Sequence, residues 1–323
     1  MSAAIRIQRH GGPDVLQVAD VPTGEPKTGE VVVRQRAIGV NFIDIYARTG
    51  LYPSELPSVL GQEAAGIITA VGDGVTEFGI GNRVAYAGVG GAYSTERVID
   101  ADRLIMLPDT IDDETAASVM LKGLTAECLL RRAFRVKPGH VVLFHAAAGG
   151  VGQIACQWAK ALGATVIGTV GSDEKLETAR TLGCDHAINY DADDFVQRVA
   201  EITDGRGVDV VYDSVGEATF PGSLDALKPR GMWVTFGQSS GKVPDFSPLM
   251  LAARGSVFMT RPRLLDYIAD RDELKSAASA LFAVIASGDV VISTPTRFPL
   301  IEAAKAHRAL EGRRTTGSLV LLP

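Results

Sequence analysis

The pattern with the clearest chemical meaning is the glycine-rich stretch HAAAGGVG, residues 145–152. An apolar run over residues 141–144 precedes it, and a helical pattern over residues 153–162 follows it. Backbone N–H groups at the start of a helix carry partial positive charge, and glycine lets a phosphate approach the main chain without a Cβ clash. The order of strand, glycine turn and helix therefore predicts a site for the diphosphate of a dinucleotide. The predicted contacts are Gly149, Gly150 and Val151.

The end of the next apolar run indicates which dinucleotide to expect. Residues 165–170 are followed by Gly171 and Ser172, where an NAD site usually has a carboxylate that binds the ribose diol. Asp173 comes next, but it is expected to begin the following helix. Without that acid nothing repels a 2′-phosphate, so the sequence favours NADPH over NADH. Ser172, Lys175 and Tyr190 are expected to supply donors and a countercharge. Taken alone, Lys175 would fit a solvated helix face better, and the small residues at the strand end favour the phosphate role.

The elements that position these residues differ between two parts of the chain. From residue 138 to residue 260, apolar runs without polar alternation alternate with helical patterns, which is typical of a doubly wound parallel sheet. The runs cover residues 141–144, 165–170, 186–188, 208–212, 232–236 and 256–259. Earlier β-branched runs and turn residues predict a glycine-rich β domain, which the tail is expected to rejoin. We expect an α/β protein with domains at residues 1–122 plus 262–323 and at residues 123–261.

The composition excludes several classes of protein. With 323 residues, of which 46% are hydrophobic and 22% charged, the chain is neither disordered nor collagen-like nor transmembrane. Its 32 basic and 38 acidic residues give a net charge of −6, which makes nucleic acid an improbable partner. Arg6 and Arg9 interrupt any secretory signal, and three scattered cysteines provide neither a disulfide framework nor a metal clip. A cytoplasmic protein without membrane attachment is expected.

Further motifs extend over the whole chain. They are HGGP at residues 10–13, GVNFID at 39–44, GLYP at 50–53, GQEAAG at 61–66 and LKGLTA at 121–126. Together with residues 145–152, they resemble the medium-chain dehydrogenase/reductase superfamily, and within it the zinc-independent NADPH:quinone oxidoreductases related to zeta-crystallin. The resemblance implies a GroES-like β-rich catalytic domain and an inserted Rossmann domain with a six-stranded parallel sheet. It also implies a homodimer that pairs through the edge of this sheet, near residues 232–236 and 256–260.

The resemblance also bears on metal binding. Zinc-containing relatives have a Cys ligand where this chain has Asn41, a His ligand where it has Gln62, and a proton-relay His where it has Tyr46. Because Asn and Gln amides are poor zinc ligands, we expect no metal. Asp44 and Glu63 remain and are expected to be buried structural residues. A quinone suits such a site, since it is already electrophilic and accepts hydride without the activation that an alcohol requires.

The same resemblance assigns the remaining contacts. It puts Asn41, Phe42 and Tyr46 beside the nicotinamide, and Tyr46 and Tyr52 on the substrate side, although simple packing explains Tyr52 almost as well. Tyr46 and Asn41 are the expected catalytic donors to the developing hydroquinone oxygen. The other implied cofactor contacts are Thr125, Ser214, Phe236, Gly237, Gln238, Ser239, Phe258, Thr260 and Arg313. Most of them follow predicted strands, where ligands bind in open parallel sheets.

Three functions fit the sequence. The first is an NADPH-dependent quinone reductase acting on a small-molecule quinone by hydride transfer. The second keeps the fold and the cofactor but reduces the C=C bond of enones or enoyl thioesters, as other zinc-free members do. The third is an NADPH-liganded structural or RNA-binding protein, since zeta-crystallin relatives include lens proteins and RNA binders. The acidic composition and the lack of an aromatic and basic stripe disfavour the third function.

Overall fold

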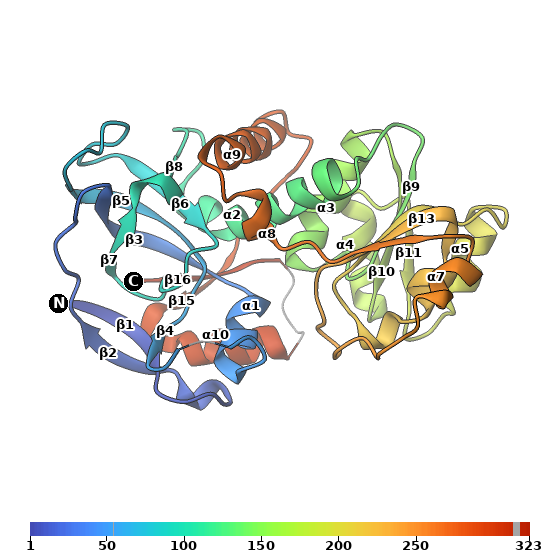
Figure 1. Cartoon of the computed structure of the whole chain (residues 1–323), viewed down its shortest axis with the longest axis horizontal. Helices are drawn as coiled ribbons and strands as arrows, with labels where there is room; N and C mark the ends of the chain where they lie inside the picture. Colours follow the sequence, from blue (N-terminus) through green and yellow to red (C-terminus); the bar gives the residue numbers. More distant parts are fainter. Residues whose placement is uncertain (54, 313–316) are drawn as a thin grey trace. The chain divides into compact units, whose positions relative to one another are not determined.

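The computed structural model describes residues 1–53, 55–312 and 317–323, and these residues form two compact units (Figure 1). Unit 1 comprises Met1–Lys122, Asp270–Ala278 and Ile292–Pro323, and unit 2 comprises Gly123–Ala269 and Ser279–Val291. This division differs from the limits predicted from the sequence in residues 262–269 and 279–291. The predicted domain limits stay a prediction.

Unit 2 is built on a parallel sheet of six strands within the described residues. The strands are β9 (Val141–Phe144), β10 (Thr165–Val170), β11 (His186–Asn189), β12 (Val208–Asp213), β13 (Leu227–Thr235) and β14 (Phe258–Thr260). They lie in the order β11-β10-β9-β12-β13-β14, and each neighbouring pair is parallel. Every residue of β9 and β12 is buried, which explains why the apolar runs lack polar alternation. The predicted doubly wound sheet is confirmed.

Helices connect these strands. They are α3 (Gly150–Ala161), α4 (Leu176–Thr181), α5 (Phe195–Ile202), α6 (Gly222–Asp225) and α7 (Leu249–Ala253), and α8 (Leu264–Tyr267) follows the last strand. The first of them, α3, begins three residues earlier than its apolar pattern predicted, because the glycines at its start are already helical. Asp194 caps α5 by accepting hydrogen bonds from the N–H groups of Val196 and Gln197. Within the described part of the chain, no helix is both long and apolar enough to cross a membrane.

Unit 1 is rich in β structure, as predicted. Its larger sheet has the order β15-β16-β3-β5-β6-β8, with β7 also paired to β3, and a second sheet has the order β2-β1-β4. The strands of the larger sheet are β3 (Glu30–Val40), β5 (Glu63–Val71), β6 (Arg83–Ala87), β7 (Glu96–Asp100), β8 (Ile105–Met106), β15 (Thr296–Pro299) and β16 (Leu319–Leu322). Those of the second sheet are β1 (Ser2–Ile7), β2 (Gln17–Val21) and β4 (Ser58–Val59). Because β16 pairs with β3, the tail rejoins the first part of the chain.

Three helices of unit 1 matter for the site. The first, α1 (Phe42–Thr49), follows β3 directly, and α10 (Ala303–Glu311) precedes β16. The third, α2 (Asp113–Glu127), belongs to unit 1 as far as Lys122 and continues into unit 2. A further helix, α9 (Arg271–Ala286), is likewise divided between the units. The start of α1 and the middle of α2 both contribute polar side chains to the buried core of unit 1.

Candidate active site

The turn between β9 and α3 has the geometry of an anion site. Gly149 caps α3 in an extended conformation, and no side chain caps the first turn of this helix. A Cβ at position 152 would overlap the carbonyl oxygen of Ala146 and would lie 2.6 Å from that of Ala147. Only glycine therefore lets the start of α3 approach the turn this closely. The N–H groups of Gly150 and Val151 lie in this first turn, which no side chain caps. Such uncapped N–H groups suit a diphosphate.

The predicted cofactor contacts of unit 2 gather at one edge of its sheet. The edge is formed by the carboxyl ends of parallel strands, and β9 lies between β10 and β12, where the strand order reverses. Such a reversal is the usual ligand position in open parallel sheets. The predicted contacts that follow these strands are Gly171 and Ser172 after β10, Tyr190 after β11, Ser214 after β12, and Phe236, Gly237, Gln238 and Ser239 after β13. Their role as cofactor contacts stays a prediction.

The end of β10 is small and polar. A Cβ at Gly171 would lie 3.0 Å from the Tyr190 hydroxyl oxygen, so this tyrosine packs against the strand end. Asp173 begins a 3₁₀ turn, as predicted, and its Oδ1 accepts a hydrogen bond of 2.8 Å from Asn189 Nδ2. Lys175, which is half-buried, ends the same turn. Gly171 and Ser172 directly follow β10, and the Asp191 carboxylate lies near the same strand end, since its Oδ2 would be 3.6 Å from a Cβ at Gly171.

Asp213, the last residue of β12, organises the loops at this edge. Its Oδ1 accepts hydrogen bonds from the N–H groups of Val215 (2.8 Å) and Gly216 (3.1 Å). Three side chains donate to its Oδ2, at distances of 2.8 to 3.3 Å: Thr219 Oγ1, Ser223 Oγ and Trp233 Nε1. The carboxylate is fully buried, so five donors replace its hydration. Ser214 therefore follows a rigidly held residue.

The His145 side chain is buried and takes part in two hydrogen bonds. Because Ser223 donates to Asp213, its oxygen accepts the hydrogen bond of 3.1 Å that joins it to His145 Nε2. His145 Nδ1 then accepts from Thr169 Oγ1 at 2.8 Å. Burial lowers the pKa of His145, which keeps the imidazole neutral. The Ser223, His145 and Asp213 side chains meet here, but Ser223 donates its proton to the carboxylate and not to the imidazole. The imidazole therefore cannot activate the serine.

In unit 1, the aromatic residues predicted to line the site form a contiguous group. Phe42 and Tyr46 lie one turn apart on the half-exposed side of α1, with ring centroids 6.3 Å apart. Tyr52 contacts Tyr46 edge to face at 5.3 Å, and its N–H donates to the Tyr46 carbonyl at 3.1 Å. Tyr52 remains 36% exposed. The rings are tilted against one another, by 46° between Phe42 and Tyr46 and by 62° between Tyr46 and Tyr52, and they form one partly exposed aromatic group.

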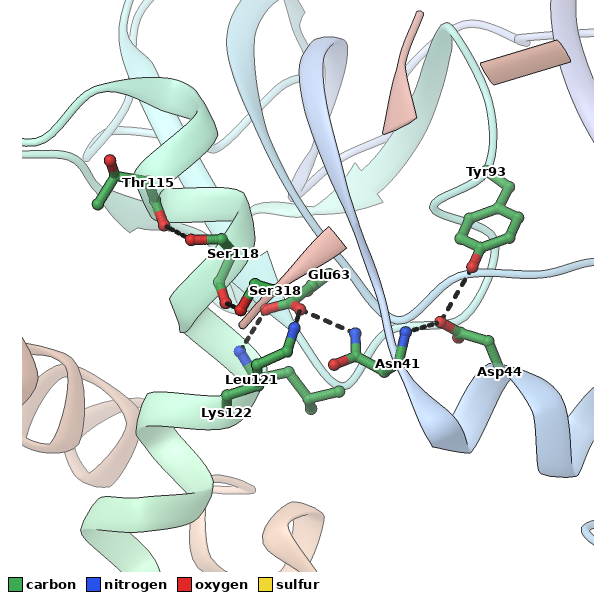
Figure 2. Close-up of polar contacts among 9 residues, drawn as sticks. All are labelled: Asn41, Asp44, Glu63, Tyr93, Thr115, Ser118, Leu121, Lys122 and Ser318. Atoms are coloured by element: carbon green, nitrogen blue, oxygen red, sulfur yellow. Dashed lines mark hydrogen bonds and ion pairs between the residues drawn. The ribbon is translucent and has the colours of Figure 1, made fainter. Parts of the chain in front are cut away.

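Asn41, Glu63 and Lys122 form a buried polar group (Figure 2). Asn41 precedes α1, Glu63 begins β5, and Lys122 lies in α2. Asn41 Nδ2 donates to Glu63 Oε1 at 2.8 Å, and Lys122 Nζ lies 2.9 Å from the same oxygen. The expectation that Glu63 is a buried hydrogen-bonded residue agrees with these contacts. Lys122 was not predicted as a site residue, because a single lysine inside a helix carries no sequence signal of burial.

A second buried chain of hydrogen bonds starts at Asp44. Its Oδ2 accepts from the Asn41 N–H at 2.8 Å and from the Tyr93 hydroxyl at 3.2 Å (Figure 2). Tyr93 also lies 3.0 Å from His307 Nε2, and His307 Nδ1 lies 3.1 Å from Arg48 Nη1. Because Arg48 can only donate, His307 Nδ1 accepts and Nε2 carries the proton. Arg48 in turn forms an ion pair with Glu311.

Burial shifts the pKa values of the groups in this hydrogen-bond network in opposite directions. It raises the pKa of Asp44 to about 7, and Asp44 Oδ1 has no hydrogen-bond partner in the part of the chain that the structure describes. Burial also lowers the pKa of His307 to about 3 and raises that of the Tyr93 hydroxyl well above its ordinary value. In this network the His307 imidazole is therefore neutral, and the Asp44 carboxyl group titrates near neutral pH.

Replacing Asp44 with Asn is expected to change how stability depends on pH. The raised pKa of Asp44 contributes stability that is complete below its ordinary pKa of 3.8 and is lost as the pH rises through about 7. Asp44→Asn removes this dependence, so the stability of the variant relative to the wild type is expected to rise by about 3 kcal/mol between pH 5 and pH 8. Urea unfolding at both pH values measures the gain, with exposed Asp20→Asn as the control. An equal difference at both pH values would refute the assignment.

The remaining predicted cofactor contacts do not belong to the groups described above. Thr125 is in α2, within unit 2, and Thr260 ends the edge strand β14. Phe258 begins that strand opposite Met232, three residues before the end of β13, and is 57% exposed. It therefore lies away from the carboxyl edge, and its role as a cofactor contact stays a prediction. Arg313 lies outside the described residues.

Sequence reasoning did not predict Arg261, which follows β14, as a cofactor or substrate contact. Its Nη1 donates to Thr235 Oγ1 at 3.0 Å and to the Gly237 carbonyl at 3.3 Å. Its Nη2 lies 3.5 Å from Gln238 Oε1. Arg261 thus holds the segment after β13, and the only sequence signal for it is its position at a strand end.

The polar groups of the site do not have the character of a metal centre. Asn41 Nδ2 donates to Glu63 Oε1, and the positively charged Lys122 Nζ contacts the same oxygen. Among residues 1–53, 55–312 and 317–323, no group of three His, Cys, Asp or Glu side chains is placed to hold a metal ion. The expectation of a metal-free site stays a prediction.

Comparisons with known proteins extend these observations. Residues 27–109 match the alcohol dehydrogenase GroES-like domain, and residues 150–277 match the zinc-binding dehydrogenase family. A quinone oxidoreductase of Pseudomonas aeruginosa is 51% identical over all of both chains. A 2-haloacrylate reductase of a Burkholderia species is 48% identical over 100% of this chain and 99% of the relative.

A solved structure shows the same similarity to quinone oxidoreductases. The crystal structure of Escherichia coli quinone oxidoreductase complexed with NADPH has a TM-score of 0.97 and 49% identity, covering 99% of this chain and 100% of that chain. The GroES-like unit and the doubly wound Rossmann unit expected from the sequence are therefore both present. The chain belongs to the quinone oxidoreductase family of the medium-chain dehydrogenase/reductase superfamily.

Proposed function

We propose that the protein is an NADPH-dependent quinone reductase that works without a metal. The observation that carries this proposal is the turn before α3, where glycine at position 152 and the absence of a side-chain cap leave backbone N–H groups for a diphosphate. No acid directly follows the strand at Gly171 and Ser172, although the Asp191 carboxylate lies near Gly171. The quinone oxidoreductase of P. aeruginosa and the NADPH-bound E. coli structure support the same cofactor and reaction class.

Each group of residues has a distinct role in this proposal. NADPH, when bound, supplies the hydride. Gly149, Gly150 and Val151 bind its diphosphate, and the residues after β10 and β11 bind the 2′-phosphate. Phe42 lies beside the nicotinamide, and the rings of Tyr46 and Tyr52 contact the acceptor. The Tyr46 hydroxyl and the Asn41 amide donate hydrogen bonds to the acceptor oxygen that gains negative charge, and most of the rate enhancement comes from this positioning.

Oxidation of NADPH in the presence of different acceptors tests the function. We expect turnover with 1,4-benzoquinone and phenanthrenequinone, and a higher kcat/KM with NADPH than with NADH. Turnover confined to a simple enone, crotonyl-CoA or 2-chloroacrylate would establish C=C reduction instead, which the Burkholderia relative makes the second candidate. Tight NADPH binding without turnover of any acceptor would favour a structural or RNA-binding protein.

We also infer a metal-free cytoplasmic homodimer. Strand β14 lies at the sheet edge, with Phe258 57% and Met259 39% exposed, and an exposed apolar edge strand is suited to pairing with a second copy. The free thiols Cys128, Cys156 and Cys184 are all buried, which agrees with a reducing compartment. Light scattering that gives a monomer mass would refute the dimer, and stoichiometric zinc in elemental analysis would refute the metal-free site.

A further inference from the structure

Three donors hold the buried carboxylate of Glu63. Its Oε1 accepts from Asn41 Nδ2 at 2.8 Å and from Lys122 Nζ at 2.9 Å, and its Oε2 accepts from the Leu121 N–H at 2.6 Å (Figure 2). The Glu63 side chain is 0% exposed and that of Lys122 is 8% exposed. One carboxylate thus joins the residue before α1, the start of β5 and the middle of α2.

The backbone provides the space for this carboxylate. A Cβ at Gly39, on the neighbouring strand β3, would overlap Glu63 Oε1 and the Ala117 carbonyl oxygen. Any residue other than glycine at position 39 would therefore displace the Glu63 side chain from its present position. The carboxylate lies in a space that only glycine leaves open.

The contacts fix the orientation of the Asn41 side chain. A carboxylate only accepts hydrogen bonds, so the amide must turn its NH₂ group toward Glu63 and its Oδ1 away from it. One N–H is committed to Glu63, and the directions of the second N–H and of Oδ1 follow from the planar geometry of the amide. If Glu63 offered a donor at Oε1, the amide would invert and exchange these two groups.

A contribution to stability does not account well for this arrangement. Buried ion pairs are often no more stabilising than apolar residues of the same size, because both charges lose their hydration. We propose that Glu63 is a positioning residue for the reaction: it holds the Asn41 amide in the orientation that the acceptor or nicotinamide needs, and Lys122 supplies its countercharge. This inference rests on the proposed function of Asn41 as a hydrogen-bond donor in quinone reduction.

A double-mutant cycle tests the inference. Glu63→Gln keeps the shape of the side chain but turns an NH₂ group toward at least one of the three donors. We expect kcat with 1,4-benzoquinone to fall about tenfold, which corresponds to one lost hydrogen bond, while the KM for NADPH stays at the wild-type value. If Glu63 acts through Asn41, Glu63→Gln has no further effect on kcat in an Asn41→Ala background. An equal loss in both backgrounds, or no loss in the wild type, would overturn the inference.

Two further variants separate positioning from folding. Glu63→Gln combined with Lys122→Met removes both charges, so it is expected to recover the stability that Glu63→Gln loses by leaving Lys122 unpaired, but not the lost kcat. Arg83→Gln breaks the half-buried ion pair of Arg83 with Asp113 in the same unit and serves as the control. It is expected to leave kcat unchanged. Recovery of kcat together with stability in the double variant would show a purely structural role and overturn the inference.

A readout independent of activity separates this inference from the proposed function. The side-chain amide resonances of Asn41 in a ¹H–¹⁵N spectrum are expected to shift in Glu63→Gln and to stay in place in Arg83→Gln. Absence of quinone turnover in the wild type would refute the proposed function, whatever the spectra show. Wild-type turnover with unshifted Asn41 resonances in Glu63→Gln would refute the positioning role alone.

Discussion

A Gly152→Ala variant is expected to bind NADPH at least about a hundredfold more weakly than the wild type, which corresponds to losing two charge-assisted hydrogen bonds of about 1.5 kcal/mol each. The added Cβ would overlap the Ala146 carbonyl oxygen and lie 2.6 Å from that of Ala147. Both are backbone atoms, so no rotamer change relieves the clash. The start of α3 must instead retract from the turn and take the N–H groups of Gly150 and Val151 with it. Calorimetric titration with NADPH measures the effect.

A matched substitution controls for the change from glycine to alanine. Gly12 has no atom within 4 Å of an added Cβ, and its φ of −69° is accessible to any residue. Gly12→Ala is therefore expected to bind NADPH as the wild type does. If Gly152→Ala also kept the wild-type affinity while remaining folded, the turn would not be the diphosphate site.

Asp213→Asn is expected to lower the free energy of unfolding by about 3 kcal/mol or more, because it leaves buried donors without acceptors. Oδ2 accepts from three side chains and Oδ1 from two N–H groups, so the new NH₂ group faces donors whichever way the amide turns. The loop that contains Ser214 loses its anchor, so NADPH binding is expected to weaken as well. Urea unfolding measures the first effect.

The control for this variant is Asp245→Asn. Asp245 is 97% exposed and pairs with Lys242, three residues before it, so the substitution is expected to leave stability nearly unchanged. A loss below about 1 kcal/mol in Asp213→Asn would mean that the five hydrogen bonds do not act together.

Much of the fold could be predicted from local patterns. The apolar runs at β9, β10 and β12 are strands because buried parallel strands need apolar residues on both faces, and this requirement is visible in the sequence. The start of α3 was placed too late, because Gly150 and Gly152 are poor helix formers and became helical only through the tight turn. Tertiary structure overrode propensity at the position where the proposed ligand binds.

The buried polar groups of unit 1 could not be predicted in this way. Asn41 and Glu63 are 22 residues apart, and Lys122 lies a further 59 residues along the chain. Arg48 and His307, which share a hydrogen bond, are separated by 259 residues. Periodicity and spacing report only on neighbours within one element, so such pairs become visible only when β3, β5, α2 and α10 pack together. The sequence predicted that Glu63 is buried, but it did not predict the contacts of Glu63 with Asn41 and Lys122.

The most direct test of the central claim, that the start of α3 binds the diphosphate of NADPH, is a crystal structure of the protein grown with this cofactor. We predict diphosphate oxygens within hydrogen-bond distance of the N–H groups of Gly150 and Val151, and the 2′-phosphate beside Ser172, Lys175 and Tyr190. A diphosphate bound elsewhere, with the turn before α3 making no contact to it, would contradict the claim.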